Sequence, residues 1–287
     1  MIGMIIAILS ATFMFGWQVF LKQSHTEELN PSVSFFFDMI FGLLIWIPIG
    51  FIFGATGNEI IKNLPIAFVS AILSEAFVFY ALTKGNLSVS SVLIATYPIF
   101  TLLFSFIINN EVLTPIQFIC IILTTIGIIM TCIEKEFKLK GLKNVVIIIP
   151  FLAAVAIGLA DTLSKHTIDT TSVYSFLVAI ALCQIPVSIG YLLITKQKWK
   201  ETIADSKNDI KKYKLGLLAG VFNIVATGLL YISFSFNLAS ICSPLTAMST
   251  PFIVLYSLII LKEKISITNK LGIIISFIGT LGIIILS

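Results

Sequence analysis

Long apolar stretches separated by short polar segments occupy almost the whole sequence. They run for about 18–23 residues each, which is enough for a helix to cross the hydrocarbon core of a bilayer. Strands of a membrane β-barrel would instead alternate apolar and polar residues over shorter segments. We therefore expect an all-α membrane protein with ten transmembrane helices. The predicted spans are Ile2–Leu21, Ser32–Gly54, Leu64–Thr83, Ser88–Ile108, Pro115–Ile133, Val145–Ser164, Val173–Thr195, Leu215–Phe236, Ala239–Leu261 and Asn269–Leu286.

The second half of the sequence repeats features of the first. When the sequence is aligned with itself, the two copies cover residues 1–140 and 141–287, with five predicted spans in each copy. An odd number of spans places two copies in opposite orientations, which is the inverted-repeat architecture of many secondary transporters. The fold prediction is therefore two inverted five-helix repeats. Corresponding features are Asn86-Leu87 and Asn237-Leu238, Pro98 and Pro251, Glu111 and Glu263, and Ser32 to Gly50 with Ser172 to Gly190.

The composition agrees with a membrane location. Hydrophobic residues make up 58% of the 287 residues and charged residues only 11%, whereas soluble domains carry about 25% charged residues. All 18 basic residues are lysine, so the chain lacks the planar guanidinium groups that grip phosphates at two points. We therefore expect no nucleic-acid partner, and we attribute the net charge of +4 to loops at the membrane surface.

The lysines also predict which side of the membrane each loop occupies. In the ten-span arrangement two lysines lie on the side of Met1 and sixteen on the other side. Cytoplasmic loops are enriched in basic residues. We therefore expect the lysine-rich loops in the cytoplasm and Met1 outside.

Short motifs recur at corresponding places in the two halves. They are Phe79-Tyr80-Ala81-Leu82, Leu87-Ser88-Val89, Tyr97-Pro98-Ile99-Phe100 and Glu111, and then Leu230-Tyr231, Ala239-Ser240, Thr250-Pro251-Phe252 and Lys262-Glu263-Lys264. These motifs resemble the EamA repeat of the drug/metabolite transporter superfamily over nearly the whole chain. The resemblance implies a multi-pass transporter of the inner or plasma membrane. It also implies that Glu111 and Glu263, at the loop edges, cap helices or pair with lysines. One departure is Asp38, which stands about where the family's first copy usually has a basic residue.

Glu75 is an ionisable residue near the middle of the third predicted span. Such a group costs roughly 2.5 kcal/mol or more at this depth, so it usually faces protein or water. One interpretation is a neutral acid that is hydrogen-bonded between helices. The other is a substrate- or proton-binding group, which is the default hypothesis for an acid inside the membrane.

Two further acids lie within predicted spans. Asp38, in the second span, is either an acid near a helix start, favoured by the helix dipole, or a second negative group that lines a transport path. Asp161 precedes Lys165 by one helical turn. This spacing predicts an ion pair between Asp161 and Lys165 on one helix face.

Aromatic and neutral polar side chains inside the spans complete the candidate site. The aromatic rings are either ordinary packing residues or, together with Glu75, a box for an organic cation, in which each cation–π contact is worth ~0.5–2 kcal/mol. Prolines are expected to interrupt the fourth and ninth helices and to free carbonyl groups there. The candidate residues besides Glu75 and Asp38 are Trp17, Gln18, Trp46, Tyr80, Tyr97, Asn223, Tyr231 and Thr246, and the prolines are Pro98, Pro244 and Pro251.

The sequence contains no phosphate-binding glycine loop and no HExxH or GxSxG motif. We therefore expect no enzyme activity, no cofactor and no metal site. The prediction is a secondary active transporter of an amine, organic cation or amino acid, working by alternating access and coupled to protons. The chain would act in a lipid bilayer as a monomer or homodimer, with Gly272, Ser276 and Thr280 bracing the outside or forming the dimer contact. A membrane scaffold or a lipid-modifying membrane enzyme is the alternative.

Overall fold

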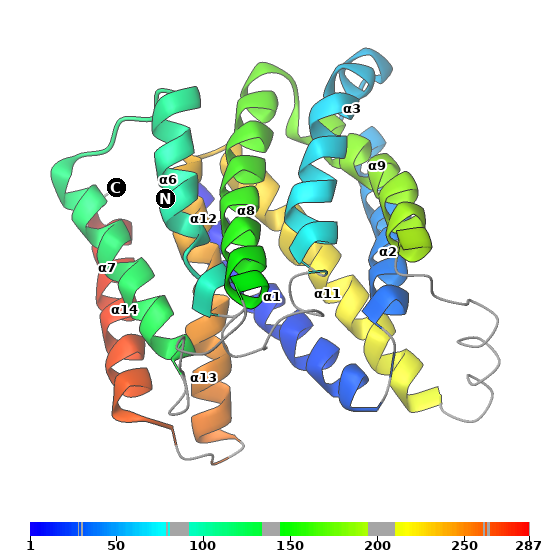
Figure 1. The fold of residues 1–287 in the computed structure, drawn as a ribbon. Coiled ribbons are helices and arrows are strands. Elements are labelled where there is room, and N and C mark those ends of the chain that lie inside the picture. The colour runs from blue at the N-terminus through cyan, green and yellow to red at the C-terminus, as the bar shows by residue number, and fades with distance from the viewer. Residues whose placement is uncertain are drawn as a thin grey trace.

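The computed structural model describes residues 1–27, 29, 31–78, 80, 92–133, 144–194, 210–260, 262 and 265–286. Every regular element in this described part is helical (Figure 1). The elements are α1 (Ile2–Thr26), α2 (Pro31–Ile52), α3 (Gly57–Ala71), the π-helical turn η1 (Ile72–Ala76), α6 (Tyr97–Ile108), α7 (Pro115–Cys132), α8 (Asn144–Thr170), α9 (Val173–Ile194), α11 (Ile210–Phe234), α12 (Ala239–Thr246), α13 (Ser249–Ile259) and α14 (Ile267–Leu286).

The predicted spans agree well with the positions of these helices. The fifth, seventh and ninth spans begin where α7, α9 and α12 begin, at Pro115, Val173 and Ala239. Within the described residues, eight segments are long and apolar enough to cross a bilayer, with α12 and α13 taken as one. The helices of the third and fourth spans, α3 with 15 residues and Val92–Ile108, are shorter. The count of ten spans therefore stays a prediction, because residues 81–91 between these two helices lie outside the described part.

The third helix begins earlier than predicted. α3 starts at Gly57 rather than at Leu64. Its first turns carry the polar residues Asn58, Glu59 and Lys62, which a hydropathy criterion excludes from a span. A helix can nevertheless continue through them, because its backbone groups stay hydrogen-bonded and an acid in the first turn interacts favourably with the helix dipole.

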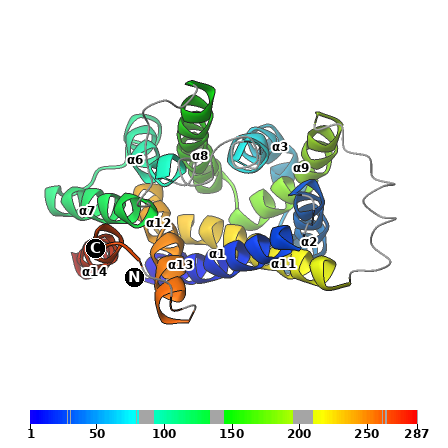
Figure 2. The same ribbon diagram turned by 60° about the horizontal axis from the view of Figure 1, so that its bottom comes forward.

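The two halves of the chain contact each other through matched pairs of helices (Figure 1; Figure 2). α1 lies along α11 and α8 contacts α3, so in each case the first helix of one predicted half packs on the third helix of the other. The second helices of the halves, α2 and α9, also pair, as do the fifth helices, α7 and α14. This exchange pattern fits a two-repeat architecture. The predicted boundary between residues 140 and 141 lies outside the described residues.

α7 and α14 pack with their backbones in close contact, away from α2 and α9 (Figure 2). A Cβ atom added at Gly127 would lie 2.3 Å from the backbone nitrogen of Ser276, and one added at Gly279 would lie 2.4 Å from Oγ1 of Thr124. Small residues permit this approach, as they do in many membrane helix pairs. Gly272 and Ser276 are thus buried against α7 of the same chain.

Two of the predicted spans are broken near their prolines, as expected. The ninth is divided into α12, which ends at Thr246, and α13, which begins at Ser249 and carries Pro251 in its first turn. α6 has Pro98 as its second residue. Proline is tolerated at these places because the amide groups of a first helical turn have no partner within the helix.

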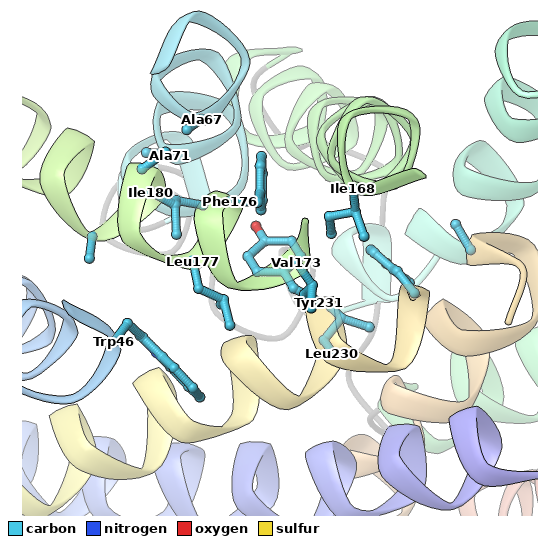
Figure 3. Close-up of a cluster of buried hydrophobic side chains, with 14 of the residues drawn as sticks. Trp46, Ala67, Ala71, Ile168, Val173, Phe176, Leu177, Ile180, Leu230 and Tyr231 are labelled. Carbon is cyan, nitrogen blue, oxygen red and sulfur yellow. The ribbon is translucent and has the colours of Figure 1, made fainter. Parts of the chain in front are cut away.

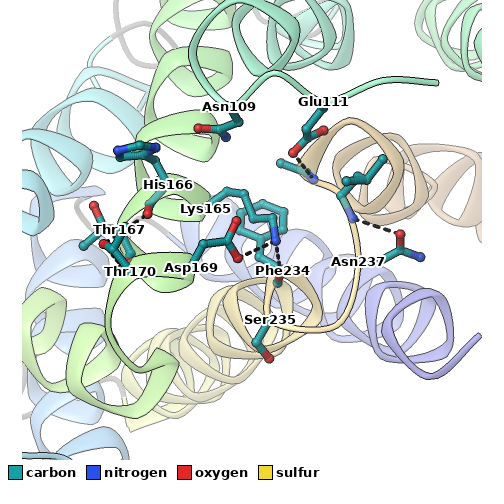
Figure 4. A network of polar contacts seen from close by, with 12 residues as sticks. Asn109, Glu111, Lys165, His166, Thr167, Asp169, Thr170, Phe234, Ser235 and Asn237 are labelled. Carbon is teal, nitrogen blue, oxygen red and sulfur yellow. Dashed lines mark hydrogen bonds and ion pairs between the residues drawn. The ribbon is translucent and has the colours of Figure 1, made fainter.

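Glu111 connects the two halves at the end of the bundle where α6 finishes and α12 starts. One carboxylate oxygen accepts a hydrogen bond from the backbone amide of Ala239, at 2.9 Å (Figure 4), and the other accepts one from the amide of Ser240, at 3.0 Å. The carboxylate therefore satisfies free donors at a helix N-terminus. The expectation that Glu111 caps a helix is confirmed, and its counterpart Glu263 lies outside the described residues.

Candidate functional site

Glu75 lies on η1, the π-helical turn that continues α3. The amide of Phe77 donates to the carbonyl of Ile72, five residues earlier, where an α-helix would use the residue four positions earlier. Such turns insert an extra residue into a helix and are frequent at functional sites. The Glu75 side chain is 7% exposed, so it faces the protein interior and not lipid.

The carboxylate of Glu75 is held by Gln184, from the middle of α9. Nε2 of Gln184 lies 2.8 Å from Oε1 and 2.9 Å from Oε2 of Glu75, so one amide group donates to both oxygens. This contact joins the third helix of the first half to the second helix of the second half. An ionised carboxylate, which has acceptors only, suits this arrangement at both oxygens.

Asp38 makes a matching acid–amide contact, in which the second helix of the first half carries the acid and the third helix of the second half carries the amide. It is 1% exposed on α2, and its Oδ2 accepts a hydrogen bond of 2.8 Å from Nδ2 of Asn223 on α11. The second helix of the first half is thus joined to the third helix of the second half. Asp38 and Glu75 lie within electrostatic range of each other. Both acids come from the first half, and both amides come from the second.

Asp161 is also a buried acid of this interior. The predicted ion pair between Asp161 and Lys165 is wrong, because each residue has other partners. Oδ2 of Asp161 accepts from Ser243 Oγ at 2.5 Å and from Thr101 Oγ1 at 3.3 Å. Lys165 instead donates to Asp169 Oδ1 at 2.6 Å and to the carbonyl of Phe234 at 2.7 Å (Figure 4). Lys165 has an acid one turn away on each side, and hydroxyl groups from α6 and α12 already occupy Asp161.

Tyr231 lies between the acids of the two halves. Its ring projects from α11 toward Phe176 on α9, at a centroid distance of 5.1 Å (Figure 3). Its hydroxyl interacts with the carboxylates of Glu75 and Asp161 and lies beside Ser74 and Ser164. Tyr97 is close to Asp161 as well, and its hydroxyl donates to the carbonyl of Ser243 at 3.0 Å.

The remaining predicted site residues lie in other parts of the packed interior. Trp46 donates from Nε1 to the carbonyl of Ile224 at 3.2 Å, and Thr246 donates to the carbonyl of Ala7 at 3.3 Å. Trp17 and Tyr80 pack against the main hydrophobic cluster. Gln18 is half-buried on α1. Of the predicted aromatic residues, Tyr231 interacts with Glu75.

Comparison with known proteins places this arrangement in a family. The family model described as the EamA-like transporter family matches residues 1–133 and again residues 144–285. The chain belongs to the EamA-like transporter family. With eight long apolar segments in the part of the chain that the structure describes, it is therefore a multi-pass membrane protein of a transporter family.

A solved crystal structure shares the fold of this EamA-like chain. It superposes with a TM-score of 0.78 over 99% of this chain and 96% of that chain, at 13% sequence identity. Identity this low supports the shared fold alone. No curated protein matches the chain.

The structure thus adds two residues to those predicted for this EamA-like protein. Gln184 carried a signal in the sequence, because it is a lone amide within the apolar run of α9, two residues before Pro186. Asp161 was recognised as an acid within a span, but the spacing to Lys165 suggested the wrong partner. Sequence spacing cannot rank the pair Asp161–Lys165 against the pair Lys165–Asp169.

The buried acids define what the interior can bind. Within the described residues Asp38, Glu75 and Asp161 receive hydrogen bonds from amide and hydroxyl groups, and none forms an ion pair. The described residues also contain no group of three or more His, Cys, Asp or Glu side chains suited to a metal ion. Such carboxylates can take up protons or a positively charged group that carries N–H donors.

Proposed function

We propose that this protein is a secondary active transporter that exchanges protons for a small amine, organic cation or amino acid by alternating access. The observation that carries the proposal is the set of three buried acids at the contact between the two halves, held by neutral partners. Intramembrane acids of this kind are rare and typically lie on substrate or proton pathways. Membership of a transporter family supports the general class of activity.

Glu75 is the proposed exchange group. A proton and an ammonium group use the same carboxylate lone pairs, so each displaces the other. Binding of the substrate would then release a proton, and protonation would release the substrate. Asp38, Asn223 and Tyr231, which lie around the same contact between the halves, are proposed to hold the remainder of the substrate.

The halves would move relative to each other around this centre. In inverted-repeat transporters the substrate site lies near the bilayer midplane at the contact between the repeats, and rocking of one repeat against the other exposes it to each side in turn. The crossed acid–amide contacts, Asp38 with Asn223 and Glu75 with Gln184, lie on this contact. The pair α7 and α14 would brace the outside. We propose the inner or plasma membrane as the location.

Transport into liposomes tests the proposal. Purified protein is reconstituted with an imposed pH gradient, and uptake of a panel of labelled small amines, organic cations and amino acids is measured. We expect gradient-driven uptake of at least one compound, and we expect Glu75→Gln to abolish it because the amide cannot take up a proton. Glu59→Gln is the matched control, since Glu59 lies in the first turn of α3 and binds Ser175 Oγ at 2.7 Å. Full coupled uptake by Glu75→Gln would remove this residue from the mechanism.

A further inference from the structure

Gln184 is a buried amide with one unsatisfied atom. Its side chain is 3% exposed, and its Nε2 group donates to both oxygens of Glu75. Its carbonyl oxygen, Oε1, receives no hydrogen bond from any described residue. A buried acceptor without a donor is unfavourable, so such atoms are uncommon and suggest a functional reason.

Gly42 on α2 is the neighbour of that oxygen. A Cβ atom added at Gly42 would lie 2.4 Å from Oε1 of Gln184. The absence of a side chain at Gly42 therefore makes room for the amide in the contact between α2 and α9. Asp38 lies one turn earlier on α2, so the amide that binds Glu75 also lies against the helix that carries Asp38.

We propose that Gln184 is a positioning residue for Glu75. Gln184 holds the ionised Glu75 carboxylate through Nε2, and its amide turns over when Glu75 takes up a proton. The proposal rests on the exchange role of Glu75 described above. It assigns a role in the proton step to a residue of the second half.

The hydrogen-bonding capacity of the two side chains explains this switch. Ionised Glu75 has only acceptors, so it pairs with the N–H donors of Nε2. A proton on Glu75 converts one of its oxygens into a donor, which conflicts with Nε2 and suits Oε1. Rotation of the amide by half a turn then lets Oε1 accept from the new hydroxyl and places Nε2 against Gly42. The chemistry of the contact between α2 and α9 thus differs between the two protonation states.

Ionisable groups on α2, α8, α9 and α11 lie in the same interior as Glu75. Asp38 faces it from α2 and Tyr231 faces it from α11. Asp161, from α8, interacts with the same Tyr231 hydroxyl. On α9 the thiol of Cys183 donates to the carbonyl of Leu64 at 3.5 Å. These groups stay unchanged when Gln184 is replaced, so a change in Glu75 titration can be assigned to the amide.

Labelling with dicyclohexylcarbodiimide tests the proposal without any knowledge of the substrate. This hydrophobic reagent reacts with protonated carboxyl groups in apolar surroundings, and peptide mass spectrometry locates the product at Glu75. We expect labelling of Glu75 to be half-maximal at a pH about one unit higher in Gln184→Met than in the original protein, because the hydrogen bond lost by ionised Glu75 is stronger than the neutral one lost by protonated Glu75. Labelling of Asp161, read in the same spectra, should keep its midpoint.

Two further variants make the test decisive. Ser188→Ala removes another buried polar group one turn along α9, whose hydroxyl contacts Met39, and it should leave the midpoint unchanged. Gly42→Ala displaces the amide while retaining Gln184, so it should move the midpoint in the same direction as Gln184→Met and replaces that variant if it fails to fold. An unchanged midpoint, or an equal shift in Ser188→Ala, would overturn the proposal. Loss of uptake in Glu75→Gln together with an unchanged midpoint would reject the role of Gln184 alone.

Discussion

At the scale of single residues, the interior of this protein combines buried acids with close contacts at glycine. Each acid of the candidate site is bonded to a neutral donor from a helix distant in sequence, as Glu75 is to Gln184. A neutral donor stabilises the charge without neutralising it, which leaves the acid able to bind a cation or a proton. The missing side chain at Gly42 leaves room for Gln184, and the one at Gly228 leaves room for the ring of Trp46.

Gly228 provides a prediction at this scale. A Cβ atom there would lie 1.8 Å from Cζ2 of the Trp46 ring, which is rigid and buried. We expect Gly228→Ala to destabilise the protein by about 1–3 kcal/mol through overpacking. Gly190→Ala is the control, because no neighbouring atom lies within 4 Å of the added Cβ, and it should stabilise the helix by about 0.5–1 kcal/mol.

Thermal unfolding can be followed by the reaction of a thiol-specific dye with Cys183 and Cys242, which are buried and free in the folded chain. The melting temperature should fall in Gly228→Ala and stay or rise in Gly190→Ala. Equal melting temperatures in the two variants would contradict the described packing of Trp46.

At the scale of elements, the two halves are joined where a helix of one ends and a helix of the other begins. Glu111 follows α6 and caps α12 (Figure 4), and Asn109 donates to the carbonyl of Thr162 on α8 at 3.1 Å. Lys165 similarly satisfies the carbonyl of Phe234 at the end of α11. These contacts supply partners for helix-end groups that would otherwise be unsatisfied inside the membrane protein.

Replacement of Glu111 tests the importance of this connection. Glu111→Ala leaves the amides of Ala239 and Ser240 without their acceptor, and we expect a loss of about 2 kcal/mol in stability. Glu111→Gln retains one acceptor oxygen and should lose about half as much. The same thermal measurement gives the order of melting temperatures, and a Glu111→Ala protein as stable as the original would show that the cap is dispensable.

At the scale of the whole molecule, the distribution of lysine predicts an orientation in the membrane. Asn110 is exposed at the end of the bundle where Gly3 contacts Asn237 and where Glu111 caps α12. Lys214 is exposed near the opposite end of α11. The excess of lysine on the side of Lys214 predicts that this side is cytoplasmic.

Cysteine labelling measures this orientation directly. A membrane-impermeant maleimide should react with Asn110→Cys in intact cells and with Lys214→Cys only after lysis. The unaltered chain is the control, since its four cysteines are buried or half-buried within helices. The reverse pattern would place the lysine-rich loops outside the cell and contradict the charge argument.

Much of this protein follows from local sequence information. Runs of apolar residues long enough to cross a bilayer predicted the helices, because inside a membrane every backbone group must bond within its own segment. Pro98 and Pro251 predicted the breaks before α6 and α13, and the repeated motifs predicted the matched halves. Glu75, Asp38 and Asn223 could be selected one by one, because a polar group within an apolar span is costly wherever it points.

The partners of these residues were decided only by tertiary structure. Hydropathy and helical spacing describe one segment at a time, whereas Glu75 and Gln184 are 109 residues apart and meet because α3 and α9 belong to opposite halves that pack together. The same packing brings hydroxyl groups to Asp161 and leaves Lys165 to Asp169. Which donor each acid receives therefore depends on contacts between helices that are distant in sequence, and these contacts are a property of the packed molecule and not of any single span.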